Sequence, residues 1–200
     1  MDAILAQREH MRAEFVAVIA SKPSAAGLAH AQQKYGVPTF VVDAKAYATR
    51  EAYDHALNEV LEREAIDFVV LAGFMRILTD GFVARYEGRM VNIHPSLLPA
   101  FPGLHAQRQA LQRGVSIAGC TVHFVEPGEV DGGPIIAQAV VPVYSDDTED
   151  TLAARIQVEE HRLYPAALRA IFDAQLQLVD GRVKGHDLSN AIALCTALEA

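Results

Sequence analysis

The chain has 200 residues, of which 51% are hydrophobic and 21% charged, and its formal net charge at pH 7 is −8. This composition predicts one globular domain over residues 1–200, and the acidic excess argues against nucleic acid or an anionic membrane as a partner. Because two cysteines make no metal or disulfide pattern, and no apolar run reaches the roughly 18–20 residues of a membrane span or resembles a signal peptide, we expect a cytoplasmic protein.

The first half of the sequence alternates between helix-like and strand-like segments. Helical patterns are expected at residues 2–12, 25–35, 49–64 and 80–86. Continuous apolar runs that read as strands lie at residues 14–20, 38–43, 66–72 and 88–93. Apolar strands that are separated by helices are typical of a parallel sheet whose two faces are both covered.

The second half of the sequence has a different pattern. A helix is expected at residues 105–113, and two strand-like runs at 117–126 and 134–143 are joined by a Gly/Pro loop, which favours an antiparallel hairpin. A long helix is expected at 150–174, and residues 175–184 resemble a hairpin with an Asp-Gly turn. Residues 186–200 have no role that we can derive. We therefore predict an α/β fold with a mainly parallel, twisted sheet and an antiparallel C-terminal part.

The start of the chain differs from the usual order of such a fold. A doubly wound sheet opens with a strand and a glycine-containing loop that holds phosphate at a helix N-terminus. Here a helical pattern begins at residue 2, and the first glycine is Gly27. We therefore expect the first strand and the phosphate loop to be absent from this chain.

A polar pair stands at the end of the strand over residues 88–93. Asn92 and His94 are two residues apart, so their side chains are expected on the same side of the strand. Ligands bind at the carboxyl ends of strands in open α/β sheets. Asp131 precedes two glycines further along the chain. An amide and an imidazole can stabilise an oxyanion, and a carboxylate can tune the imidazole, so this set suits acyl transfer.

Each of these residues also has a structural interpretation. A histidine after a strand is usually a packing or surface residue. An aspartate before two glycines is by default a turn former. Asn92 can merely cap or bridge the end of a strand, so the pattern gains its weight from the combination.

Four segments together resemble the phosphoribosylglycinamide formyltransferase family of purine synthesis, and they are residues 72–78, 92–103, 121–125 and 131–135. The resemblance covers roughly residues 2–185. It implies a Rossmann-like, three-layer formyltransferase fold without its first strand, in a single catalytic domain that is truncated at its N-terminus relative to the family. It also implies transfer of a formyl group from 10-formyltetrahydrofolate, as cosubstrate, to the amine of phosphoribosylglycinamide. The implied partners are these small molecules, without metal, in a monomer or homodimer.

The resemblance assigns roles to individual residues. Asn92 and His94 match the catalytic amide and imidazole, and Asp131 matches the carboxylate that raises the pKa of that histidine. The expected folate contacts are Arg50, Met75, Arg76, Ile77, Leu78 and Asn92, and the expected substrate contacts are Pro95 and Glu160, of which Glu160 matches a ligand of the ribose hydroxyls. His123 fits the family pattern, and we expect it to give structural support. The family's phosphate loop precedes the position of Met1, so no phosphate site is assigned.

Other functions remain open from the sequence. A formyltetrahydrofolate hydrolase keeps the same Asn, His and Asp, although such enzymes typically carry a regulatory domain ahead of the catalytic one. A folate-binding remnant without turnover is motivated by the expected loss of the phosphate loop, and the intact polar residues count against it. A methionyl-tRNA formyltransferase is longer and has a basic C-terminal domain. A dinucleotide dehydrogenase is the weakest alternative, because no Gly-x-Gly-x-x-Gly follows a strand.

Overall fold

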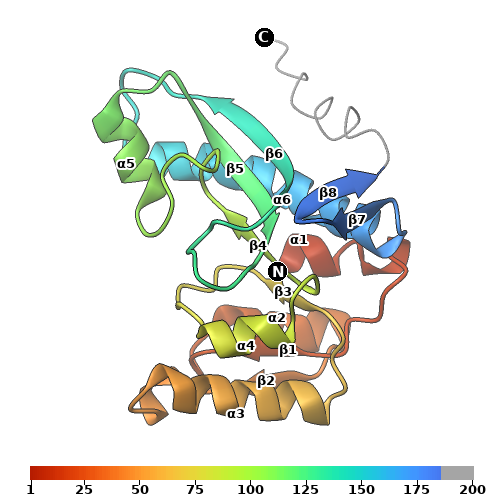
Figure 1. Cartoon of the computed structure of the whole chain (residues 1–200). Coiled ribbons are helices and arrows are strands. Elements are labelled where there is room, and N and C mark those ends of the chain that lie inside the picture. Colours follow the sequence, from red (N-terminus) through yellow and green to blue (C-terminus); the bar gives the residue numbers. More distant parts are fainter. Residues whose placement is uncertain (186–200) are drawn as a thin grey trace.

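The structure is a computed structural model that describes residues 1–185, so the assessment of residues 186–200 lies outside the described residues. Its helices are α1 (Asp2–Leu5), α2 (Ala26–Tyr35), α3 (Arg50–Arg63), α4 (Asp80–Arg85), α5 (Ala106–Arg113) and α6 (Glu149–Phe172) (Figure 1). Its strands are β1 (Val18–Ala20), β2 (Thr39–Val41), β3 (Val69–Leu71), β4 (Met90–His94), β5 (Ile117–Phe124), β6 (Ile135–Pro142), β7 (Leu176–Val179) and β8 (Arg182–Gly185). Short 3-10 turns occupy Arg8–His10 and Ala44–Ala46.

The described strands pair in three groups. β1 and β2 form a parallel pair, and a second sheet has the order β3-β4-β5-β6, in which β3 and β4 are parallel while β5 and β6 are antiparallel to their neighbours. β7 and β8 form an antiparallel hairpin. The predicted α/β class with an antiparallel C-terminal part is therefore confirmed. The strands β1, β2 and β3 are shorter than their apolar runs, because each pairs along three residues with one neighbour within the described chain.

The expected helix over residues 2–12 is wrong in its length. Helix α1 ends at Leu5, a single 3-10 turn follows, and the backbone leaves that turn extended at Met11. Ile4, Leu5 and Met11 are all buried, so apolar side chains spaced as on one helix enter the core from a short helix and an extended segment. Sequence spacing alone does not separate these two solutions.

Helix α1 is held against α2 by one carboxylate. Asp2 Oδ1 accepts from the Tyr35 hydroxyl at 2.6 Å, from His30 Nε2 at 2.6 Å and from Lys34 Nζ at 3.2 Å. The hydrogen bond from Tyr35 is the main reason that the pKa of Asp2 is lowered to about 2, with Lys34 and His30 adding to it. The position of α1 shapes a pocket, because α1 forms one of its walls.

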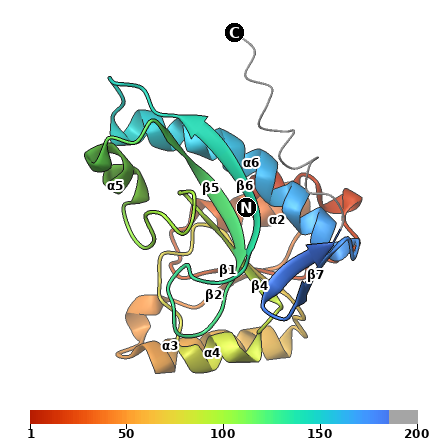
Figure 2. The same cartoon turned by 45° about the horizontal axis from the view of Figure 1, so that its top comes forward.

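Two layers of helices cover opposite faces of the four-stranded sheet. In β4, Val91 and Ile93 pack into the cluster that contains α6, whereas Met90 packs with residues of α3 and α4. Figure 2 shows α6 running along β5 and β6, and these elements share one apolar cluster. The Tyr164 hydroxyl lies 2.8 Å from Leu71 O and 3.1 Å from Val91 O, so α6 is also tied to β3 and β4. Asn92 and His94 point to the face away from α6, as alternation requires.

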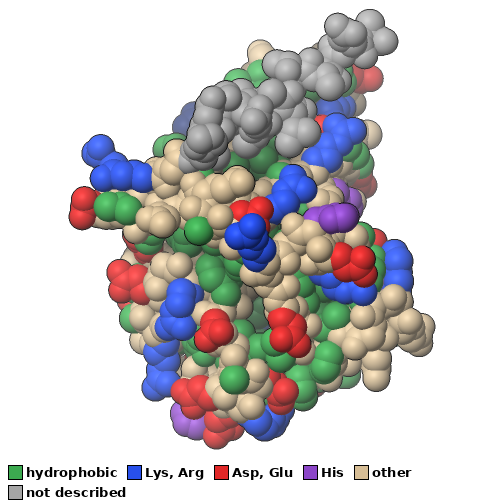
Figure 3. Space-filling model, turned by 90° about the vertical axis from the view of Figure 1, so that its right-hand side faces the viewer, with side chains coloured by type: hydrophobic (Ala, Val, Ile, Leu, Met, Phe, Trp, Pro, Cys, Tyr) green, Lys and Arg blue, Asp and Glu red, His purple; other side chains and the backbone are tan. Residues whose placement is uncertain are grey.

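Within residues 1–185, none of the helices combines the length and the apolar character that crossing a bilayer requires. On the face in Figure 3, basic and acidic side chains are interspersed over the described part of the surface. That face therefore carries no extended basic patch of the kind that binds nucleic acid.

Gly119 permits the close approach of β5 to its neighbours. A Cβ atom at this position overlaps with the carbonyl oxygen of Ala139 on β6 and lies 2.8 Å from Leu97 Cδ2. We predict that Gly119→Ala lowers the free energy of unfolding by about 1–3 kcal/mol, the usual range for overpacking. Gly81→Ala is the matched control, because a Cβ there meets open space within a helix. Urea unfolding checks both variants, and equal stability of the two contradicts the close contact.

The carboxylate of Asp2 predicts a pH-dependent contribution to stability. Its pKa is about 2 in the folded protein and has an ordinary value of 3.8. The contribution is therefore complete above pH 3.8 and is lost as the pH falls toward 2. We expect Asp2→Asn to be less stable than wild type at pH 6, and the difference to shrink at pH 3. Urea unfolding at both values measures it, with the exposed Asp67→Asn as control. A gap that is the same at both pH values contradicts the interpretation.

Candidate active site

The pairing of β4 with β5 places four polar side chains on one face of the sheet. Asn92 is opposite His123, and His94 is opposite Thr121, in an antiparallel register. The alternate residues of β4, Val91 and Ile93, face the α6 cluster. Alternation along both strands therefore separates a polar face from an apolar one. His94, Thr121 and His123 are all buried, which requires that each has hydrogen-bond partners.

His94 makes contacts through both ring nitrogens. Its Nδ1 lies 3.2 Å from Asp131 Oδ2, and its Nε2 lies 2.9 Å from the carbonyl oxygen of Phe101. The side chain is 6% exposed. A carboxylate and a carbonyl both accept hydrogen bonds, and only the imidazolium form carries a hydrogen on each nitrogen. The surroundings of His94 therefore suit its charged form.

Asp131 lies in the loop between β5 and β6, with a positive φ of 57°. Its Oδ2 accepts from the backbone N–H of Gly103 at 2.8 Å, in addition to facing His94. Its Oδ1 lies 3.7 Å from His123 Nε2, beyond hydrogen-bond range. Gly128 in the same loop donates its N–H to Asp80 Oδ1 at 3.0 Å, which fixes the loop to the start of α4. The carboxylate is thus held between two loops and the end of β4.

The segment over residues 95–105, here called the covering loop, lies over the polar face. It contains Phe101 and His105 in the left-handed region, at φ 56° and 60°. Side chains hold its carbonyl groups. Gln109 Nε2 on α5 donates to Pro102 O at 3.1 Å and to Leu104 O at 3.0 Å, and Ser96 Oγ donates to Ala100 O at 2.5 Å. The loop therefore has a defined shape without pairing as a strand.

Thr121 and Gln138 fasten the covering loop to the sheet. The Thr121 hydroxyl donates to Ser96 O at 2.7 Å and accepts from Leu98 N at 3.0 Å. Gln138 Nε2 on β6 lies 2.8 Å from Leu98 O and 2.9 Å from Thr121 Oγ1. These contacts lie on the same face as His94, so the loop that carries Phe101 is fixed relative to the imidazole that it contacts.

The expected folate segment over residues 75–78 follows the carboxyl end of β3. Because Leu71 pairs with Asn92, this segment leaves the sheet beside the polar face. Met75 and Ile77 are exposed, Leu78 is buried in the core, and the Arg76 guanidinium lies 4.8 Å from the centre of the Tyr53 ring. Asp54 on α3 is buried and accepts from Thr79 N at 2.7 Å, which anchors the exit of the segment. Arg50 is exposed at the first position of α3, and no interaction links it to Asn92 or His94 within residues 1–185.

Exposed apolar side chains occur on all three loops around the polar face. They belong to the segment after β3, the covering loop and the β5–β6 loop, and they are Met75, Ile77, Leu104 and Val130. Apolar side chains grouped at the rim of a polar site are typical of a place where an apolar part of a ligand is covered.

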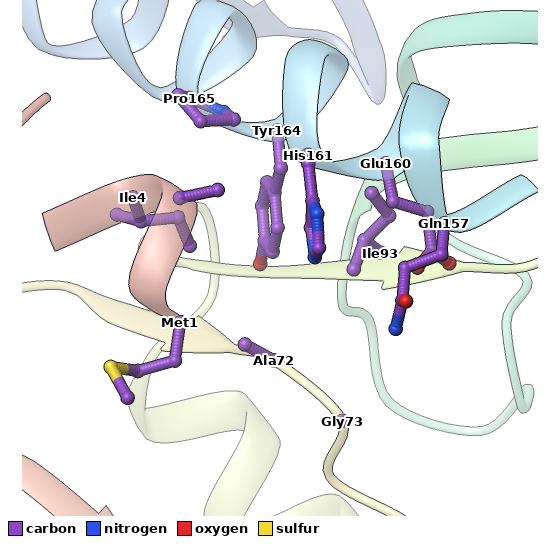
Figure 4. Close-up of a pocket in the computed structure, with 11 residues that line it drawn as sticks. Met1, Ile4, Ala72, Gly73, Ile93, Gln157, Glu160, His161, Tyr164 and Pro165 are labelled. Carbon is purple, nitrogen blue, oxygen red and sulfur yellow. The ribbon is translucent and has the colours of Figure 1, made fainter. Parts of the chain in front are cut away.

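Glu160 lies in a separate pocket of about 220 Å³ on the α6 side of β4. In Figure 4 the side chains of Gln157, Glu160 and His161 descend from α6 toward the ends of β3 and β4, and Met1 lies on the other side. Burial raises the pKa of Glu160, and the amino group of Met1 opposes that shift. Pro95, directly after His94, is half-buried at the start of the covering loop.

The structure thus brings together Asn92, His94 and Asp131. It also places residues 75–78 and the Glu160 pocket at the same carboxyl edge of the sheet. Thr121, Gln138 and His123 had no predicted chemical role. Thr121 and His123 are two residues apart on a strand, so period-2 alternation could have placed both side chains on one face of the sheet. The contact of Gln138 with the covering loop crosses 40 residues and has no local signature. Within residues 1–185, no group of His, Cys, Asp or Glu side chains is arranged to hold a metal ion.

Known proteins share the sequence and the fold of this chain. Residues 2–168 match the family described as formyl transferase. The chain is 48% identical to phosphoribosylglycinamide formyltransferase of Escherichia coli over 86% of this chain and 76% of that protein. It is 49% identical to the trifunctional purine biosynthetic protein adenosine-3 of Drosophila melanogaster, over 84% of this chain but only 12% of that protein. The crystal structure of glycinamide ribonucleotide transformylase 1 from Symbiobacterium toebii matches with a TM-score of 0.86 and 46% identity, over 92% of this chain and 87% of that one.

The role of Thr121 in fixing the covering loop is testable. Thr121→Val keeps the shape of the side chain but leaves Ser96 O and Leu98 N without their hydroxyl partner. We expect the free energy of unfolding to fall by about 1–3 kcal/mol, because buried polar groups lose their hydrogen bonds. Amide exchange at Leu98 should become faster than in wild type. Thr39→Val on β2 is the control, and unchanged exchange at Leu98 contradicts the role.

Proposed function

This chain belongs to the formyl transferase family, and on that premise we propose that it transfers a formyl group from 10-formyltetrahydrofolate to the amine of phosphoribosylglycinamide. The reaction is a step of purine biosynthesis, in accord with the name of the Drosophila melanogaster relative. As part of the same proposal, the protein acts in the cytoplasm on these two small molecules, as a monomer or homodimer, and needs no metal.

One observation carries the proposal. An amide, an imidazole and a carboxylate meet at the carboxyl end of β4, and the Asp131 carboxylate is within 3.2 Å of the imidazole of His94. Acyl transfer to an amine creates a negatively charged oxygen on a tetrahedral carbon, and groups that donate hydrogen bonds to that oxygen lower the barrier. Asn92 Nδ2 and a protonated His94 are such donors.

The reaction begins when the substrate amine attacks the formyl carbon. The carbonyl electrons move onto the formyl oxygen, which becomes the oxyanion. Asn92 donates through Nδ2, and His94 donates through Nε2 after it exchanges the Phe101 carbonyl for the oxyanion. The Asp131 carboxylate stays on Nδ1 and compensates the charge of the imidazolium. The Asn92 amide is oriented before the charge develops, whereas the Nε2–H of His94 reaches the oxyanion only after it leaves the Phe101 carbonyl.

Collapse of the intermediate completes the transfer. The bond from carbon to the folate nitrogen breaks, and the new amide bond to the substrate nitrogen remains. The attacking amine must lose a proton and the departing folate nitrogen must gain one. His94 passes this proton, directly or through a water molecule that Asp131 holds, and its buried position limits competing exchange with bulk water.

The two substrates approach from different sides of the carboxyl edge. The folate lies along residues 75–78, with Arg50 beside it. The exposed side chains of Met75 and Ile77 cover the flat face of one of its aromatic rings. The ribose of the amine substrate lies in the α6 pocket, where Glu160 accepts from its hydroxyls, and Pro95 borders the path to His94. The reacting atoms then meet over Asn92.

Two alternatives make different predictions for one assay. A formyltetrahydrofolate hydrolase releases formate from the donor without the amine substrate, and a folate-binding remnant binds the donor without turning it over. We expect the absorbance of the folate product to rise only when phosphoribosylglycinamide is present. Equal rates with and without the amine favour the hydrolase, and binding of the folate without any turnover favours the remnant.

The role of His94 has its own test. His94→Ala removes one oxyanion donor and the proton carrier, so we expect kcat to fall by about a hundred- to a thousandfold or more. Circular dichroism and thermal unfolding establish that the variant is folded. His10→Ala, at an exposed position remote in sequence, should keep wild-type kcat. Near-normal turnover by His94→Ala contradicts the proposed chemistry.

A further inference from the structure

His123 lies beside the site, but no step of the proposed reaction involves it. It is opposite Asn92 across the β4–β5 pair, and it is 1% exposed. The β5–β6 register shifts between Val122 and His123, so a bulge falls at this residue. Bulges next to active sites re-aim a side chain, and a buried histidine must satisfy both of its nitrogens.

The backbone fixes which nitrogen of His123 carries the proton. Its Nδ1 lies 2.9 Å from the carbonyl oxygen of Phe124, and a carbonyl can only accept, so Nδ1 donates. In the neutral ring, Nε2 then holds a lone pair. The close approach of the Phe124 carbonyl depends on Gly133, where a Cβ would overlap with that oxygen. Burial lowers the pKa of His123, which favours this neutral form.

The lone pair of His123 faces the amide of Asn92. Nε2 lies 3.3 Å from Asn92 Nδ2, so the amide nitrogen donates one of its two hydrogens to the ring. The opposite orientation of the amide brings Oδ1 against a lone pair, which is repulsive. Asp131 does not supply a competing partner, because its Oδ1 is 3.7 Å from Nε2, and its Oδ2 is engaged by His94 and Gly103.

We propose that His123 is a positioning residue, which as the Nδ1–H tautomer holds the Asn92 amide with its nitrogen toward the reacting atoms. The chain of contacts runs from the Phe124 carbonyl through the ring of His123 to Asn92 Nδ2. The second hydrogen on Nδ2 remains available for the oxyanion. This inference rests on the proposed function for its kinetic consequence, whereas the tautomer and the amide orientation are properties of the resting protein.

A double-mutant cycle tests the kinetic consequence. His123→Leu removes the acceptor, and we expect kcat to fall by about tenfold or more, below the full loss of one oxyanion donor, with KM for both substrates changed less than about threefold. In an Asn92→Ala background the same change should cost almost nothing further. His123→Gln, whose Oε1 can accept from Asn92, should restore most of kcat. Additive losses in the cycle, or equal losses for Leu and Gln in folded variants, overturn the proposal.

Nitrogen-15 NMR tests the resting protein without reference to turnover. We expect His123 in wild type to have a protonated Nδ1 and an unprotonated Nε2, and His123→Leu to shift the side-chain amide resonances of Asn92. The Nε2–H tautomer, or Asn92 resonances that do not move, overturns the proposal even if the enzyme is active. Conversely, an inactive wild type that shows both signatures refutes the proposed function and leaves the positioning contact intact.

Discussion

The antiparallel pairing of β4 with β5 is the constraint on which the site depends. Its register sets Asn92 against His123 and His94 against Thr121, and it sends the alternate residues into the core beneath α6. A shift of one residue would turn every polar side chain of this group into the apolar layer. The register is maintained by apolar residues such as Val91 and Val122, which are fully buried. Packing on one face of the strands therefore determines the chemistry on the other.

The polar face is stable because its groups satisfy one another. Within residues 1–185, no buried side-chain nitrogen or oxygen lacks a hydrogen-bond partner. Carbonyl oxygens of the covering loop accept hydrogen bonds from the side chains of Thr121, Gln138 and Gln109, which belong to three different elements. Such a network is rigid when complete and unfavourable when broken, so the loop and the sheet are fixed together. The imidazole of His94 is positioned by the same network, through the carbonyl of Phe101.

Local patterns in the sequence predicted the elements well where spacing alone decides them. The helices near residues 50–63 and 149–172 and the hairpin strands near 117–124 and 135–142 were found, and so was the pairing of Asn92 with His94 on one face. The helix over residues 2–12 was predicted too long, because burial of Ile4 and Met11 is compatible with two backbone paths. Residue chemistry suggested the grouping of Asp131 with His94, and the family resemblance assigned their roles, but no local rule brings residues this far apart together. Partners such as Phe101 O and Gly103 N are backbone atoms, which residue identity does not reveal.

Several non-glycine residues of this protein have a left-handed backbone, and the consequence of replacing them differs with their position. Non-glycine residues with positive φ occur at Ala65 and Ala174 after helices, at Asp180 in the terminal hairpin, and at Phe101, His105 and Asp131 around the site. Each stores strain of about 1 kcal/mol, which glycine relieves. At Ala65 and Ala174 that relief is available to an engineer who seeks a more heat-resistant protein. At Phe101 the same exchange frees the backbone that directs a carbonyl oxygen to His94, and at Asp131 it removes the carboxylate itself. The strain at these two positions therefore keeps polar groups of two loops in contact with His94.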